Sequence, residues 1–84
     1  MPPINFIDHA LERMSERGIS EDEVLKTLKL GKKEPAKYGR IKFSMEFNLT
    51  DDEKKKEFNK KIVIVLADKN KSVIDVISVY AKFY

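Results

Sequence analysis

The chain has 84 residues, of which 42% are hydrophobic and 37% charged, and its formal net charge is +3. This length allows one hydrophobic core, so we expect a single domain over residues 1–84. With no cysteine and one histidine, disulfides, a thiolate metal site and a cysteine nucleophile are excluded, and we expect no metal and no cofactor. The chain lacks a signal-peptide pattern and an apolar run near the roughly 20 residues that span a bilayer, which predicts a cytoplasmic protein without membrane contact.

Positive charge is concentrated in two segments. From Lys26 to Lys42, seven basic residues stand against one acid, Glu34, which gives a local charge of +6. Such asymmetry suits a polyanionic partner, although a lysine-rich surface kept for solubility is the alternative. Arg40 in particular is either a phosphate contact or a guard of an edge strand. The candidate nucleic-acid contacts are Lys32, Lys33, Lys37, Arg40 and Lys42. A second basic cluster comprises Lys54, Lys55, Lys56, Lys60 and Lys61.

The first part of the chain predicts two short helices joined by about two residues. Asp8 can cap the first helix, which we expect to end at Arg17 because Gly18 favours the left-handed conformation. Ser20 and Glu23 have the spacing of a capping box, which starts the second helix. That second helix has an apolar stripe at helical spacing and closes at a glycine: Val24, Leu25, Leu28, Leu30 and Gly31.

From Pro35 onward the hydrophobic period changes to two. Residues 40–49 alternate polar and apolar, which predicts a strand with one buried face. Residues 61–67 are apolar and β-branched after the initial lysine, and we expect an interior strand covered on both faces. Residues 72–82 predict a further strand, antiparallel to the previous one. Residues 33–38 can add a short strand, and Pro35 would confine this strand to the edge of the sheet.

The segments between the last three strands are polar. Residues 50–59 form either a long hairpin tip or one helical turn, and residues 68–71 form a turn. With helices at about 8–30 and strands at about 33–83, the predicted class is α+β. We expect a helical hairpin packed on an antiparallel sheet of three or four strands.

The first helix carries the candidate chemistry. On a helix, His9, Arg13 and Arg17 lie at about 0°, 40° and 80°, so they form one ridge beside the buried stripe. An imidazole can move a proton at physiological pH, and arginines one turn apart can clamp a phosphate and stabilise the charge of a pentacovalent phosphorus. The alternative is that Glu12 and Glu16 make ordinary surface ion pairs with the arginines.

The last strand adds a tyrosine. By alternation we expect Tyr80 to share a face with Ile74 and Val76. Its hydroxyl can donate to phosphate or its ring can stack on a base, and the alternative is a core aromatic with a solvated hydroxyl. Asp75, on the opposite face, either pairs with Lys61 or an arginine or marks a polar pocket.

The segment DHALERMSERGIS (residues 8–20) resembles the opening of a small prokaryotic family catalogued as domain of unknown function 4258. Its members typically start with His-Ala-x-x-Arg-Met-x-Glu-Arg-Gly-Ile and end in a Thr/Ser-Val-aromatic strand, here residues 78–80. The family is grouped with RelE/ParE-like toxins, in the fold class of barnase, EndoU, colicin and RelE ribonucleases. Such proteins pack N-terminal helices on a curved antiparallel sheet and cut RNA without a metal.

The resemblance implies roles for four residues. His9 would transfer a proton, Arg13 and Arg17 would contact phosphate, and Tyr80 would contribute from the sheet. RNA would be the substrate, because the 2′-hydroxyl attacks the phosphorus, and an antitoxin or other protein could be a further partner. We therefore expect a toxin-like, metal-independent endoribonuclease or RNA-binding protein of the RelE/ParE-like class. The alternative is a non-catalytic module that binds nucleic acid, or a protein-interaction domain that pairs through a strand edge.

Overall fold

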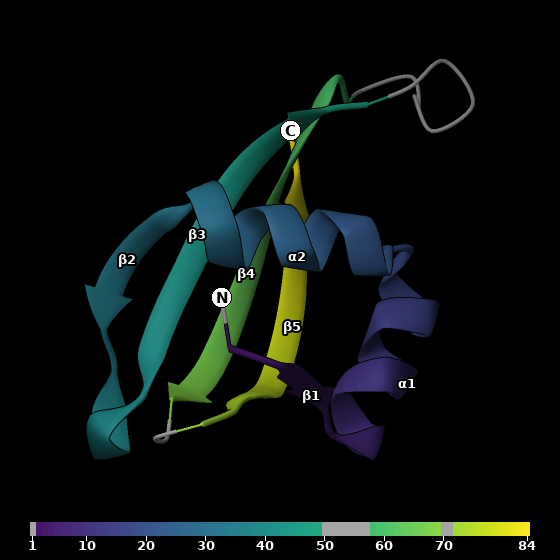
Figure 1. The fold of residues 1–84 in the computed structure, drawn as a ribbon. Coiled ribbons are helices and arrows are strands. Elements are labelled where there is room, and N and C mark those ends of the chain that lie inside the picture. The colour runs from purple at the N-terminus through teal and green to yellow at the C-terminus, as the bar shows by residue number, and fades with distance from the viewer. Residues whose placement is uncertain (1, 50–57, 70–71) are drawn as a thin grey trace.

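A computed structural model describes residues 2–49, 58–69 and 72–84. These residues form an α+β fold with two helices on a five-stranded mixed sheet, in the order β1-β5-β4-β3-β2 (Figure 1). The elements are β1 (Ile4–Phe6), α1 (Asp8–Arg17), α2 (Glu21–Leu30), β2 (Lys32–Pro35), the 3₁₀ turn η1 (Lys37–Gly39), β3 (Ile41–Asn48), β4 (Lys60–Lys69) and β5 (Ile74–Phe83). The helical hairpin and the α+β class are confirmed, and β2 lies at the sheet edge as expected.

The sheet differs from the predicted three or four antiparallel strands in its first strand. β1 adds a fifth strand, and it runs parallel to β5, with Ile4 opposite Ile74 and Phe6 opposite Val76. The other pairs of neighbouring strands are antiparallel. Three residues are too few to show an alternating pattern in the sequence, and their partners lie 70 positions further along the chain. β1 therefore owes its structure to β5 rather than to a local signal.

Local signals set the helix boundaries, with one exception. Gly18 adopts the left-handed conformation (φ 64°) after α1, and the Ser20–Glu23 capping box is formed as expected. The prediction that Asp8 caps α1 is wrong: Ile7 is the N-cap, without a side-chain bond, and Asp8 is the first helical residue. The chain leaves β1 directly into the helix, so the position before Asp8 takes the extended conformation of a cap.

Gly31 ends α2 for a steric reason. Its φ of −73° is open to any residue. A Cβ there, however, would lie 2.7 Å from the carbonyl oxygen of Ser44 and closer still to that of Thr27. The glycine thus lets the end of α2 approach the backbone of β3.

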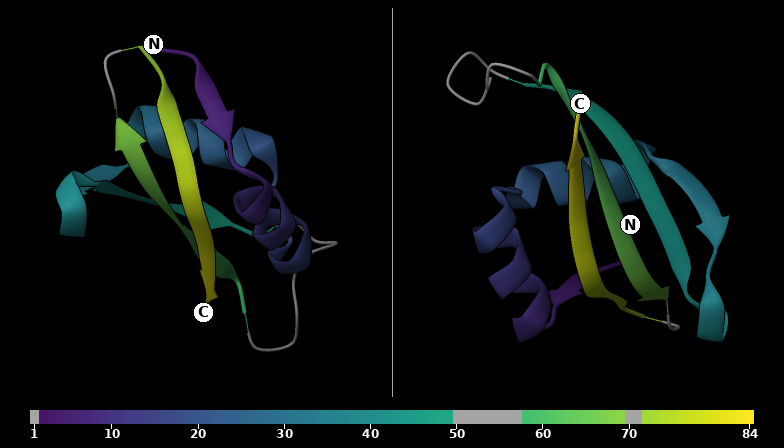
Figure 2. Two further views of the ribbon diagram at one scale, coloured as in Figure 1. Left: turned by 90° about the horizontal axis from the view of Figure 1, so that it is seen from below. Right: turned by 180° about the vertical axis from the view of Figure 1, so that it is seen from behind.

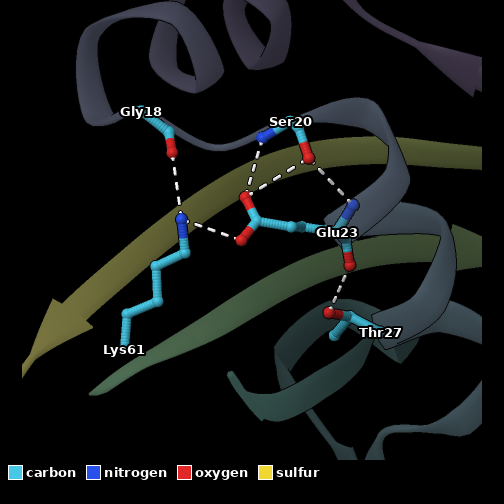
Figure 3. A network of polar contacts seen from close by, with 5 residues as sticks. All are labelled: Gly18, Ser20, Glu23, Thr27 and Lys61. Atoms are coloured by element: carbon cyan, nitrogen blue, oxygen red, sulfur yellow. Dashed lines mark hydrogen bonds and ion pairs between the residues drawn. The ribbon is translucent and has the colours of Figure 1, made fainter. Parts of the chain in front are cut away.

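Lys61, on the central strand β4, binds the turn between the two helices (Figure 3). This residue begins the apolar part of β4, and only 1% of it is exposed. Its Nζ lies 2.8 Å from Oε2 of Glu23 and donates to the carbonyl oxygen of Gly18 at 3.2 Å. The other carboxylate oxygen, Oε1, accepts from the backbone N–H of Ser20 at 3.0 Å, and Thr27 Oγ1 donates to the Glu23 carbonyl at 2.7 Å. Lys61 is therefore part of the core and not of a basic surface cluster.

The helices cover one face of the sheet (Figure 2). On that face β4 buries Lys61, Val63, Val65 and Ala67. The side chains that alternate with them, Ile62, Ile64 and Leu66, are only half-buried, and no described helix or strand packs on them. The expectation that residues 61–67 are covered on both faces is wrong, because the sheet is a single layer with one helical cover.

A bulge changes which face the end of β5 presents. Leu66 pairs with Ser78 but the next residue of β4 pairs with Val76, so Ile77 is extra. Val76 and Val79 are consequently both buried on the helix side. Tyr80 pairs with half-buried Ile64 and points to the other face. The expectation that Tyr80 shares a face with Ile74 and Val76 is therefore wrong.

Tyr84, which follows β5, contacts the start of β4 and the later part of β3. Tyr84 exchanges two backbone hydrogen bonds of 2.9 Å with Lys60, and its hydroxyl donates to Glu46. This bond and the Lys60 ammonium lower the pKa of the Glu46 carboxyl, and the same bond raises the pKa of Tyr84. The expected tip at residues 50–59 lies outside the described residues, except for its last two. Of the expected turn at 68–71, the first two residues end β4 and the rest lies outside.

The substitution Glu23→Ala tests whether the Lys61–Glu23 ion pair holds the helical hairpin on the sheet. It removes the Glu23 carboxylate that pairs with the buried Lys61 ammonium and breaks the capping box, so we expect a loss of about 3–5 kcal/mol in the free energy of unfolding. The matched change Glu21→Ala removes an exposed acid from the same helical turn and should cost less than about 1 kcal/mol. Urea unfolding measures both, and equal losses would contradict the anchoring role.

Candidate functional site

The candidate ridge begins with the N-terminal half of α1. His9 is exposed near the start of the helix. Arg13, one turn later, is partly exposed, and its Nη1 pairs with Oε2 of Glu16 at 2.9 Å. The ordinary surface ion pair that the sequence left open is therefore present at Arg13. It lies at the surface of the helix, where one exposed pair contributes little to stability.

Arg17 is held against the sheet. Its Nη1 donates to the carbonyl oxygen of Val79 at 2.8 Å, and its Cζ lies 5.2 Å from the centre of the Tyr80 ring. β1 pairs with β5 only as far as Val76, so the edge of β5 beyond that point is open to α1, which packs along it (Figure 1). Arg17 thus satisfies an edge carbonyl and reaches the ring on the face away from the helices.

Helix α1 and strand β5 meet through Arg17 and Tyr80. We call His9, Arg13, Arg17 and Tyr80 the α1–β5 surface. Two of the four, Arg17 and Tyr80, are in direct contact, and Arg13 lies one turn before Arg17 along the same ridge. His9 and Tyr80 are exposed and the arginines are partly exposed. A guanidinium has five N–H donors, so Arg17 can hold Val79 and still bind an anion.

The described residues provide neither a metal site nor a membrane-spanning helix. Among residues 2–49, 58–69 and 72–84, no three His, Cys, Asp or Glu side chains lie close enough to hold a metal ion. In the same part of the chain, no helix is long and apolar enough to cross a membrane.

Comparison with known proteins identifies a family. A family model described as "Domain of unknown function (DUF4258)" matches residues 6–81. The chain belongs to this family. The match includes the whole α1–β5 surface and confirms the resemblance seen in residues 8–20. No curated protein and no solved structure matches the chain.

The basic candidates of this DUF4258 domain lie on and around β2 and β3, toward the edge of the sheet that is opposite to the α1 edge. Lys32 and Lys42 both pair with Glu34: Nζ of Lys32 lies 3.6 Å from Oε1, and Nζ of Lys42 lies 3.8 Å from Oε2. Lys33 lies on the helix face, with Nζ 5.9 Å from the centre of the Phe43 ring. These contacts divide the candidates between the two faces of the sheet.

The remaining basic candidates belong to the turn η1 and its end. Lys37 is exposed. Arg40 lies over the ring of Tyr38, with Cζ 5.9 Å from the ring centre. The five basic candidates therefore do not join the α1–β5 surface or form one patch.

Sequence reasoning missed the links between elements. Asp75, which was expected to pair with Lys61 or an arginine or to mark a pocket, accepts a hydrogen bond from Asn5 of β1 at 3.0 Å. The burial of Lys61 did have a signal, since it is in phase with Val63 and Val65 along β4. The contact of Arg17 with the sheet had none, because it depends on where β1 stops.

A double-mutant cycle on Arg17 and Tyr80 tests the link across the β5 edge. We expect Arg17→Ala and Tyr80→Leu to be coupled by about 0.5–1 kcal/mol in unfolding free energy, because the cation lies over the ring. The matched cycle of Arg13→Ala with Tyr80→Leu should be additive within about 0.5 kcal/mol, because Arg13 pairs with Glu16 instead. Additivity in the first cycle would show that the contact is not formed in solution.

Proposed function

We propose that this domain is a toxin-like RNA-binding protein of the RelE/ParE-like class, and that it cleaves RNA without a metal ion. The observation that carries the proposal is the contact between Arg17 of α1 and Tyr80 of β5. It joins two elements far apart in sequence and sets an exposed aromatic ring beside a partly exposed arginine, on the helix that also carries Arg13 and His9.

The topology supports the class. A helical hairpin follows a short first strand and packs on one face of a sheet whose last three strands are consecutive and antiparallel. Helices packed on antiparallel strands are what the resemblance to RelE/ParE-like proteins implies, although β1 adds a parallel strand that the resemblance does not include. The family match over residues 6–81 covers both helices and nearly all of the antiparallel strands.

The chemistry of the α1–β5 surface suits a phosphodiester. Arg13 and Arg17 can bind the phosphate oxygens, and the exposed ring of Tyr80 can stack on a base. His9 can take the proton of the 2′-hydroxyl. The 2′-oxygen then bonds to phosphorus and the bond to the 5′-oxygen breaks, with a proton passing from solvent water to that oxygen. The products are a 2′,3′-cyclic phosphate and a 5′-hydroxyl, and DNA, which lacks the 2′-hydroxyl, is not cut.

A second candidate function is RNA binding without cleavage. It is favoured because both arginines already have partners within the domain. Arg13 forms an ion pair with Glu16, and Arg17 donates a hydrogen bond to the carbonyl oxygen of Val79. Among the described residues, no side chain is recorded in a hydrogen bond that would orient the imidazole of His9. Such a surface can grip a backbone without positioning a base for proton transfer.

Cleavage in a chelator separates the two functions. A labelled mixed RNA pool is incubated in EDTA with the parent, His9→Ala and the control Lys26→Ala, which removes an exposed charge from α2. We expect the parent and control to cleave and His9→Ala to be slower by roughly 100-fold or more, the usual share of a general base. A DNA pool of the same sequences should remain intact.

Binding is measured on the same proteins by fluorescence anisotropy at low and high salt. We expect Arg13→Ala to bind RNA more weakly than Lys26→Ala, with a smaller dependence on salt. RNA binding without cleavage by the parent would support the non-catalytic function. Absence of RNA binding at low salt would overturn both.

A further inference from the structure

A cavity of about 230 Å³ opens on the helix face, beyond the end of α2. Its lining comes from α2, β2, β3, the end of β4, the start of β5 and the N-terminal segment. In Figure 1, α2 crosses the sheet. The cavity is separate from the α1–β5 surface, since none of the four residues of that surface lines it.

The apolar lining comes from Leu28, Ile41, Phe43 and Ile74. Leu28, Phe43 and Ile74 are at least 94% buried, so their positions are fixed by the core. Ile41 packs against the same core. A preformed apolar floor of this kind favours an apolar ligand body, because it offers few hydrogen-bond partners to a polar one.

Three lysines, each from a different strand or helix, also line the cavity: Lys29, Lys33 and Lys69. All three are exposed, and no carboxylate of the described residues is recorded in an ion pair with any of them. Lys32 and Lys42 pair with Glu34, and Lys60 pairs with Glu46, whereas the exposed lysines Lys26, Lys37 and Lys82 resemble the cavity lysines in having no such pair within the described residues. The cavity therefore combines an apolar floor with three positive charges that lack a negative partner within the described chain.

We propose that this cavity binds a small organic carboxylate with an apolar, preferably aromatic, body. The carboxylate would be held by the three ammonium groups and the body would lie on Phe43 and Leu28. Lysines bind as point charges, so they attract an anion without the planar, bidentate geometry that an arginine favours for carboxylate and phosphate alike, and no arginine lines the cavity. The lack of polar side chains other than lysine in the lining argues against a nucleotide base.

The volume limits the ligand. A cavity of about 150 Å³ holds benzene, so by proportion 230 Å³ accommodates roughly nine or ten non-hydrogen atoms. Phenylacetate has this size and combines one aromatic ring with one carboxylate. It is a suitable probe, and phenylacetamide is its neutral counterpart.

The test is a titration of the isotopically labelled protein followed by NMR. We expect phenylacetate to shift signals of Leu28, Ile41, Phe43 and Ile74, and phenylacetamide to bind about tenfold more weakly, since three exposed cations contribute modestly. The triple variant Lys29→Met, Lys33→Met, Lys69→Met should lose this preference for the charged probe. The control triple Lys26→Met, Lys60→Met, Lys82→Met removes the same charge outside the cavity and should keep it.

Each other outcome overturns the proposal. Acetate that shifts the same signals with equal affinity would indicate an anion patch without recognition of the apolar body. Equal binding of the two phenyl probes would remove the role of the lysines. Shifts of these signals by RNA and not by phenylacetate would assign the cavity to nucleic acid. The result is independent of the RNA cleavage assay, because the probe and the residues differ.

Discussion

The structure depends on one buried ion pair, between Lys61 of β4 and Glu23 of α2. An ammonium with 1% exposure is costly unless its charge and its donors are satisfied. Glu23 of α2 supplies the opposite charge, and the Gly18 carbonyl in the turn between the helices accepts a hydrogen bond. Because the same carboxylate completes the capping box with Ser20, one side chain joins the start of α2 to the central strand β4.

Both proposed surfaces follow from the position of this hairpin. Fixing the Gly18 end of α1 places Arg17 beside the part of β5 that β1 leaves unpaired, and so builds the α1–β5 surface. At the other end, Gly31 brings α2 down to the backbone of β3. Beyond the end of α2, no described helix covers the sheet, and the cavity lined by Lys29, Lys33 and Lys69 lies there. One helical cover thus positions both of the proposed sites.

The sequence predicts features that depend on neighbouring residues. The capping box at Ser20, the left-handed Gly18 and the alternation along β3 are each local, and each is observed. Features that depend on distant partners were missed: β1 needs a parallel strand 70 positions away, and one extra residue in β5, Ile77, reverses the face of Tyr80. The candidate site was predictable as a ridge on a helix, but not as a contact with the sheet.

Hydrogen exchange of Lys61→Met tests the central claim most directly, with Lys60→Met as control. Methionine keeps much of the apolar stem of the lysine and removes the ammonium, including its contacts with Gly18 and Glu23. We expect faster exchange at backbone amides of residues 18–24, while the paired amides of β3 and β4 keep their rates. Parental rates at the turn, or an equal acceleration throughout the sheet, would contradict the claim that Lys61 holds the helical hairpin in place.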